Sequence, residues 1–241
     1  MGELPDWRRA TNIATDPELY ERENDAVAAD GRLDRALREV ADWAGRTLLD
    51  VGCGTGYWLP RYAVDADRVI GVEPDPDLLA RAHRRTRHLD NVEVVRGSAE
   101  HLPVAPATVD VAHARFAYFF GEGAEAGLHE VGRVLRPGGV FVAVDNDWGY
   151  GRFADLLRRA DVGNAAIDPE TTDRWWRDRS AIRIDVPGAW RCRSAEELEA
   201  ILRLELPGPV VDAFVAAHPG TRELSYGFAL FVVRAPFEPA G

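Results

Sequence analysis

Short apolar runs alternate with amphipathic stretches along the chain, a pattern typical of a sheet whose strands are joined by helices. In the first 145 residues this pattern predicts strands at Leu48–Val51, Arg68–Val72, Val92–Arg96, Val109–Ala114 and Val140–Val144. The apolar run Leu224–Arg234 predicts the last strand. One more strand is expected before it, and the segments that compete for it are Ala181–Val186, Gly188–Arg193 and Arg203–Leu206.

Two helices are predicted before the first strand. Asp16 followed by Pro17 is a helix-start signal, and that helix is expected to run to about Ala29. Apolar residues at helical spacing predict a second helix over 33–43. The polar stretch 1–15 is expected to be partly irregular.

Cap and turn residues predict later helix boundaries. One helix is expected to begin at Tyr57, and another to follow Asp168 as its cap. The string Arg136–Gly139 contains Pro and two Gly, so it is expected to end a helix before the strand at Val140.

The stretch Thr47–Leu59 runs from a strand into the turn G-C-G-T-G and then into a predicted helix. Glycine is needed where the backbone turns with positive φ, or where it approaches a ligand with no side chain between. A strand, a glycine-rich turn and a helix N-terminus form the place where an α/β sheet receives a nucleotide-like ligand. A dinucleotide fingerprint would need Gly at position 57, which is Tyr, and no G-K-[ST] of a phosphate-binding loop follows.

An acidic residue, Glu73, ends the second predicted strand about 20 residues after the glycines, and Pro74 marks the turn that follows. A carboxylate at that place can accept hydrogen bonds from the hydroxyls of a bound ribose. The alternative is a solvated charge at a strand end. The position of Glu73 relative to Gly52 favours ribose binding.

The string D-V-G-C-G-T-G over 50–56 resembles the first motif of class I S-adenosylmethionine-dependent methyltransferases. Further features of that family follow in order: Glu73, the stretch Gly97–Pro103, and the string R-V-L-R-P-G-G-V-F-V-A-V-D over 133–145. The resemblance covers about residues 46–145. It implies an α/β, Rossmann-like, doubly wound sheet of seven mostly parallel strands, with N-terminal cap helices and an insert after the fifth strand. The chain 1–241 is then one domain, with a helical cap over 1–45, a cofactor-binding core over 46–145 and a substrate-side elaboration over 146–241.

The resemblance also implies S-adenosylmethionine as cofactor. Where the family has an Asp that meets adenine, this chain has Ser98, whose hydroxyl accepts a hydrogen bond more weakly, and Glu100 is a candidate to substitute for it. The predicted cofactor-binding residues are Asp50, Gly52, Cys53, Gly54, Gly56, Glu73, Pro74, Ser98, Ala99, Glu100 and Ala114.

Methyl transfer is an in-line displacement at a carbon activated by a sulfonium, so alignment and desolvation matter more than reactive side chains. No catalytic residue is assigned, and the candidates are His113, Tyr118 and Asp145. The predicted acceptor-binding residues are Tyr20, Tyr118, Phe119, Asn146 and Trp148. Structural alternatives remain for these residues: a histidine within a strand and an aromatic cluster are often core, and 145–147 can be a polar turn. In the resembling family the N-terminal helices often cover the cofactor, or they can simply pack on the sheet. The insert tryptophans can wall a pocket for a small substrate or form the core of the cap; they are Trp148, Trp175, Trp176 and Trp190.

The segment after the fourth strand reads Ala114-Arg115-Phe116. It lacks the Asp that catechol-type O-methyltransferases place there for magnesium, so no metal is expected. It also lacks the D/N-P-P-Y/F signature of enzymes that methylate base amines. The second absence disfavours nucleic-acid base amines as acceptors, and a small organic acceptor is favoured instead.

The net charge, the lack of long apolar runs and the cysteine content indicate which binding partners, location and disulfides to expect. Lys+Arg 29 against Asp+Glu 40 gives a net charge of −11, which disfavours nucleic acid and anionic membranes. No apolar run approaches the ~18 residues of a membrane span and no signal segment is present, so the cytoplasm is the expected location. Cys53 and Cys192 are far apart, and no disulfide is expected. We expect a monomer or homodimer that methylates a small molecule; the alternatives are an enzyme acting on protein or RNA, and a non-catalytic S-adenosylmethionine-binding protein.

Overall fold

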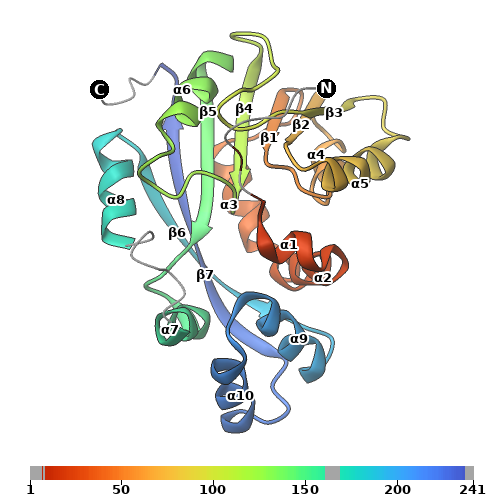
Figure 1. The fold of residues 1–241 in the computed structure, drawn as a ribbon. Helices are drawn as coiled ribbons and strands as arrows, with labels where there is room; N and C mark the ends of the chain where they lie inside the picture. The colour runs from red at the N-terminus through yellow and green to blue at the C-terminus, as the bar shows by residue number, and fades with distance from the viewer. Residues whose placement is uncertain (1–6, 8, 161–168, 237–241) are drawn as a thin grey trace.

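The computed structural model describes residues 7, 9–160 and 169–236, and it contains a seven-stranded sheet in the order β3-β2-β1-β4-β5-β7-β6 (Figure 1). Strands β1 to β5 run parallel, and β7 is antiparallel to both of its neighbours, β5 and β6. The strands are β1 (Thr47–Val51), β2 (Arg68–Glu73), β3 (Val92–Arg96), β4 (Val109–Arg115), β5 (Leu135–Asn146), β6 (Ile182–Arg191) and β7 (Glu223–Arg234). The predicted α/β, doubly wound, mostly parallel sheet is confirmed.

Helices cover both faces of the sheet. They are α1 (Thr11–Thr15), α2 (Pro17–Ala28), α3 (Arg32–Val40), α4 (Leu59–Tyr62), α5 (Pro76–Thr86), α6 (Glu125–Val134), α7 (Gly151–Ala160), α8 (Pro169–Asp178), α9 (Ala195–Glu205) and α10 (Gly208–Ala217). Leu37 of α3 and Leu198 of α9 belong to the core on one face, and Leu128 of α6 and Trp176 of α8 to the core on the other. The strand order reverses between β1 and β4, and ligands bind at such a point in open α/β sheets.

The N-terminal helices lie at the carboxyl ends of the central strands, where Figure 1 shows α1 and α2 beyond the arrowhead of β4. Asp16 caps α2 as predicted, and its side chain accepts the N–H of Leu19 at 2.9 Å. Residues 7, 9 and 10 are irregular, in line with the expectation for 1–15, whereas Thr11–Thr15 form the short helix α1. A helix this short has no stability of its own, so packing must hold it. The predicted cap Asp168 lies outside the described residues.

Strand β6 joins two of the segments that compete for the sixth strand. Its pairing with β7 runs from Ile182 to Arg191, so most of Ala181–Val186 and of Gly188–Arg193 belongs to one strand. Pro187 interrupts the sequence pattern but not the strand, because β6 is an edge strand and an edge tolerates a residue without an N–H. The third segment, 203–206, ends α9.

The turn at 136–139 lies inside β5 and not before it. Strand β4 pairs with Leu135 through Val109 and next with Val140 through Val111, so the residues between them bulge out of the ladder. The N–H of Gly138 donates to the carbonyl of Ala235 at 2.9 Å and ties the bulge to the end of β7. Helix α6 ends before the turn, as expected, whereas the helix expected at Tyr57 begins two residues later as the single-turn α4.

Three tryptophans that follow the fifth strand are core residues. Trp175, Trp176 and Trp190 are each at most 5% exposed. Trp176 stacks on Phe231 with 5.2 Å between ring centroids, and Trp190 stacks on Tyr226 at 5.3 Å. Their packing favours the core interpretation over a pocket wall. The division of the chain at residues 45 and 145 stays a prediction.

Candidate functional site

The glycine turn follows β1 and closes on β2. The N–H groups of Gly52 and Cys53 both donate to the carbonyl of Val72, at 2.9 and 3.0 Å. Gly52 and Gly54 have φ angles of +75° and +57°, which residues with a Cβ rarely adopt. A Cβ on Gly52 would also lie 2.7 Å from the Cβ of Ala117. Glycine is therefore required here both by conformation and by space.

The carboxylate of Glu73, at the end of β2, joins the glycine turn to the turn after β2. Its Oε2 accepts the N–H of Gly54 at 2.8 Å, and its Oε1 accepts the N–H of Asp75 at 2.9 Å. The residue is 5% exposed, and burial raises its pKa to about 7 although both hydrogen bonds favour the ionised form. Each oxygen keeps a further lone pair, so the carboxylate can accept more hydrogen bonds from a ligand.

The segment after β3 lies beside Glu73. The N–H of Gly97 donates to the backbone carbonyl of Glu73 at 3.4 Å. Ser98 and Ala99 are buried, and Glu100 is half-buried. The residues expected to contact adenine therefore lie next to the residue expected to contact ribose.

The segment after β4 lies across the glycine turn, with Ala117 against Gly52. On either side of Ala117, Phe116 and Tyr118 have φ angles of +52° and +59°. Such angles are uncommon for bulky residues, and strained backbone of this kind concentrates at functional sites. The Phe116 side chain packs with the core of one sheet face, near Phe228, whereas Tyr118 packs with the core of the other.

The N-terminal segment covers the turn from the other side. A Cβ on Gly54 would lie 2.9 Å from the Cδ1 of Ile13, so that side chain fills the space over the glycine. The next residue back, Asn12, donates from Nδ2 to Oε1 of Glu205 at 2.9 Å. Helix α1 is therefore fastened to α9 while it covers the turn.

Comparison with known proteins agrees with this geometry. A family profile described as "Methyltransferase domain" matches residues 48–139. A demethylmenaquinone methyltransferase of Staphylococcus saprophyticus is 32% identical over 114 residues, which are 46% of this chain and 49% of that protein. Residues 48–139 therefore match a methyltransferase domain, which supports the resemblance to class I S-adenosylmethionine-dependent methyltransferases.

Other similarities show how far the match to known proteins extends. An uncharacterized 37.1 kDa protein in transposon TN4556 of Streptomyces fradiae is 37% identical over 108 residues, 43% of this chain and 31% of that protein. The chain thus spans less than half the length of these curated relatives. The solved geranyl diphosphate C-methyltransferase of Streptomyces coelicolor A3(2) has a TM-score of 0.53 at 20% identity, and the match covers 90% of this chain and 83% of that one. At this identity the likeness shows a shared fold.

Among the candidate bases, His113 lies in the core. It is 0% exposed, and its ring packs edge-on against Trp43 and Tyr62. Neither ring nitrogen has a hydrogen-bond partner within the described ranges, and burial lowers the pKa of the imidazole to about 3. These surroundings are those of a neutral core histidine.

Tyr118 and Asp145 have partners different from those of His113. The Tyr118 hydroxyl donates to the carbonyl of Gly123 at 3.1 Å, and burial together with Glu100 raises its pKa to about 12. Asp145 is the penultimate residue of β5, and burial raises its pKa to about 6 although the charge of Arg183 opposes that rise. A carboxyl with that pKa is suited to general-base chemistry near neutral pH.

Two of the predicted acceptor residues, Tyr20 and Asn146, lie near the same residue, Tyr226. The hydroxyl of Tyr226 donates to Oδ1 of Asn146. Burial and the carboxylates of Glu23 and Glu205 raise the pKa of Tyr20. We call Tyr20, Glu23, Asn146, Glu205 and Tyr226 the acceptor-side cluster.

Sequence reasoning missed Glu23, Glu205 and Tyr226. They come from α2, α9 and β7, and no local pattern relates segments so far apart. Burial, followed by the neighbouring carboxylate, raises the pKa of Glu23 well above its ordinary value. Burial also raises the pKa of Glu205. Two neighbouring buried carboxyls avoid being ionised together, so this pair favours sharing one proton.

The remaining predicted acceptor residues differ in burial. Phe119 is 2% exposed and packs on Phe141 with 4.8 Å between ring centroids, in the core under α6 and α8. Trp148 is half-buried, and its indole N–H has no partner among the residues that the structure describes. Phe119 therefore has the surroundings of a core residue, whereas Trp148 can still reach a ligand.

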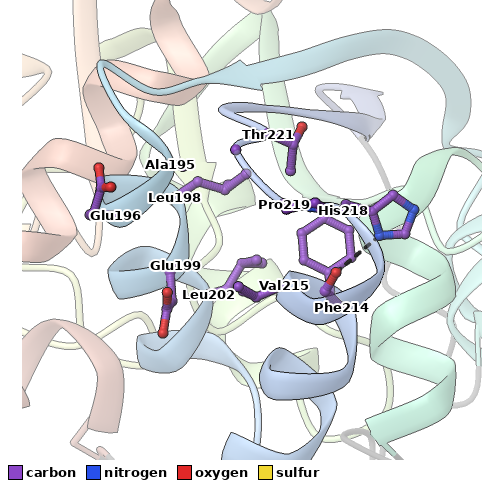
Figure 2. Close-up of a pocket in the computed structure, with 11 residues that line it drawn as sticks. Ala195, Glu196, Leu198, Glu199, Leu202, Phe214, Val215, His218, Pro219 and Thr221 are labelled. Carbon is purple, nitrogen blue, oxygen red and sulfur yellow. Dashed lines mark hydrogen bonds between the residues drawn. The ribbon is translucent and has the colours of Figure 1, made fainter.

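A hollow of about 240 Å³ lies between α9 and α10 (Figure 2). Leu198, Leu202 and Phe214 line it together with the acidic side chains of Glu196 and Glu199. None of its lining residues comes from the glycine turn or from the carboxyl ends of β1 to β5. It is therefore separate from the candidate cofactor site.

No three His, Cys, Asp or Glu side chains form a metal-binding group within 7, 9–160 and 169–236. No helix in those ranges is long and apolar enough to cross a bilayer. Cys53 and Cys192 are both free and buried.

The pKa of Asp145 gives a stability prediction with a definite sign. Burial raises this pKa from 3.8 to about 6, so the folded state favours the neutral carboxyl, and its stability falls as the pH rises through this interval. Asparagine stays neutral. Asp145→Asn should therefore gain up to about 3 kcal/mol relative to wild type between pH 4 and pH 7.

Urea unfolding of both proteins at several pH values measures this change. The exposed Asp90→Asn is the matched control and should show no such trend. A free-energy difference between Asp145→Asn and wild type that is independent of pH would contradict the assignment of a raised pKa.

Proposed function

We propose that this chain transfers a methyl group from S-adenosylmethionine to a small-molecule acceptor by in-line displacement. The observation that carries the proposal is the Glu73 carboxylate, held by the N–H groups of Gly54 and Asp75 at the carboxyl ends of β1 and β2. Its free lone pairs suit the two ribose hydroxyls of this cofactor. The glycine turn lets the ligand approach the backbone, so these residues fit the cofactor, which supplies an electrophilic methyl carbon on sulfonium.

The N-terminal segment is proposed to exclude water from this site. Ile13 fills the space over Gly54, so a ligand bound there displaces its side chain. The Nε of Arg9 donates to Oδ2 of Asp75 at 2.8 Å and anchors the segment close to Glu73. Closing over the ligand would expel water and strengthen the electrostatic contacts inside.

The acceptor is proposed to be a small organic molecule that contacts the acceptor-side cluster. Asn146 places this cluster at the carboxyl end of β5, where an acceptor can approach the methyl group. Two names among the similar proteins support the class: one is a demethylmenaquinone methyltransferase and another a geranyl diphosphate C-methyltransferase. The net charge of −11 disfavours RNA as the acceptor.

Transfer of tritiated methyl groups tests this function. The protein is incubated with methyl-tritiated S-adenosylmethionine and a cell extract, which is then separated into small molecules, protein and RNA. Label is expected among the small molecules and should be lost with Glu73→Gln. Label in protein or RNA would overturn the acceptor class, and cofactor binding without transfer to any fraction would support a non-catalytic binding protein.

A further inference from the structure

A buried arginine lies beside the glycine turn. Arg115 is the last residue of β4, and its side chain is 5% exposed. Its guanidinium carbon lies 3.7 Å from the ring centroid of Trp58, which follows the turn directly before α4. A guanidinium is rarely buried without partners that satisfy its charge and its five N–H groups.

The partners of Arg115 leave part of the guanidinium unused. Nη1 donates to the hydroxyl of Tyr62 at 3.1 Å, and Nη2 lies 3.5 Å from Oδ1 of Asp34. Nε and Nη2 are buried and make no hydrogen bond with any described residue. Unpaired buried N–H groups are costly, so these donors fit a ligand with acceptor oxygens.

An acidic side chain of opposite charge lies on the same face of the sheet. Asp50 of β1 is the register partner of His113, and Arg115 is two residues further along β4, so the three side chains share one face. Asp50 is 2% exposed. Burial raises its pKa to about 7, and the charge of Arg115 opposes that rise.

A buried carboxyl and a buried guanidinium beside the glycine turn are complementary to a zwitterion. The proposed cofactor carries one, because its methionine tail ends in an ammonium and a carboxylate. We propose that Arg115 binds the tail carboxylate of S-adenosylmethionine through its unused N–H groups, with Asp50 facing the tail ammonium. This inference rests on the proposed function and adds a tail-binding residue that the sequence motifs do not include.

Ligand truncation tests the role of Arg115 without any measurement of activity. S-adenosylhomocysteine has the tail, whereas 5′-methylthioadenosine has the same adenosine and sulfur without it. Calorimetry should show that Arg115→Gln weakens S-adenosylhomocysteine binding by about 10- to 100-fold and leaves 5′-methylthioadenosine binding unchanged. Arg68→Gln is the control, because Arg68 is 52% exposed at the amino end of β2, and it should alter neither affinity.

Equal losses for both ligands would overturn the proposal and make Arg115 a positioning residue for the turn. Unchanged binding of both would overturn it as well. Should Arg115→Gln fail to fold, the wild type and Arg115→Lys test the proposal instead. The wild type should bind S-adenosylhomocysteine at least about 10-fold more tightly than its decarboxylated analogue. In Arg115→Lys this ratio of affinities should be smaller. A wild type that binds neither ligand would refute the proposed function itself and not merely the role of Arg115.

Discussion

Replacing Glu73 by glutamine is expected to weaken S-adenosylhomocysteine binding by at least about 100-fold. The Glu73 carboxylate accepts N–H groups from Gly54 and Asp75, and its remaining lone pairs are assigned to the ribose hydroxyls. Glutamine keeps one acceptor oxygen, and its NH₂ group would face a backbone donor. Glu93→Gln is the matched control, because this carboxylate is 51% exposed on β3.

The same carboxylate predicts how affinity depends on pH. Burial raises the Glu73 pKa to about 7 in the free protein, and only the ionised form accepts hydrogen bonds with both oxygens. Binding must therefore displace a proton at low pH, and affinity should rise by up to about tenfold per pH unit between pH 5.5 and 7 and then level off. In Glu73→Gln one proton fewer is displaced on binding, so this rise of affinity with pH should be lost. An identical pH profile in the variant would contradict the assignment.

Replacing Gly54 by valine is expected to abolish cofactor binding. At a φ of +57° any residue with a Cβ is strained, and the new Cβ would also lie 2.9 Å from Cδ1 of Ile13. The backbone strain costs roughly 1–2 kcal/mol of stability. The clash adds to this strain, because α1 must move and the valine side chain occupies the space proposed for the ligand.

Gly45→Val separates these two effects. Gly45 has a φ of +65°, but a Cβ there would meet nothing within 4 Å. This control should lose a similar roughly 1–2 kcal/mol in urea unfolding and bind S-adenosylhomocysteine normally. Binding by Gly54→Val at the wild-type level would contradict the placement of the ligand over the turn.

Local signals were enough to predict the parts of the fold that depend on neighbouring residues. Asp16 caps α2, the glycines turn after β1 and Glu73 ends β2, because each follows from residue type and spacing alone. For strand β6 the sequence left competing segments, and Pro187 between two of them is tolerable only because β6 lies at the sheet edge.

Contacts between distant segments could not be predicted from the sequence. Helix α1 has no side-chain cap, and it is held by contacts such as that of Asn12 with Glu205. The burial of Arg115 depends on Trp58, Tyr62 and Asp34, which reach it from other elements. A sequence motif identifies ligand-binding residues that lie in one local turn. It does not identify residues that reach the same ligand from distant segments of the chain.

Calorimetric titration of the wild-type protein with S-adenosylhomocysteine tests the cofactor assignment most directly. Saturable binding of about one ligand per chain is expected, because one glycine turn with one Glu73 carboxylate forms the site. No binding at a ligand concentration of about 1 mM would contradict it.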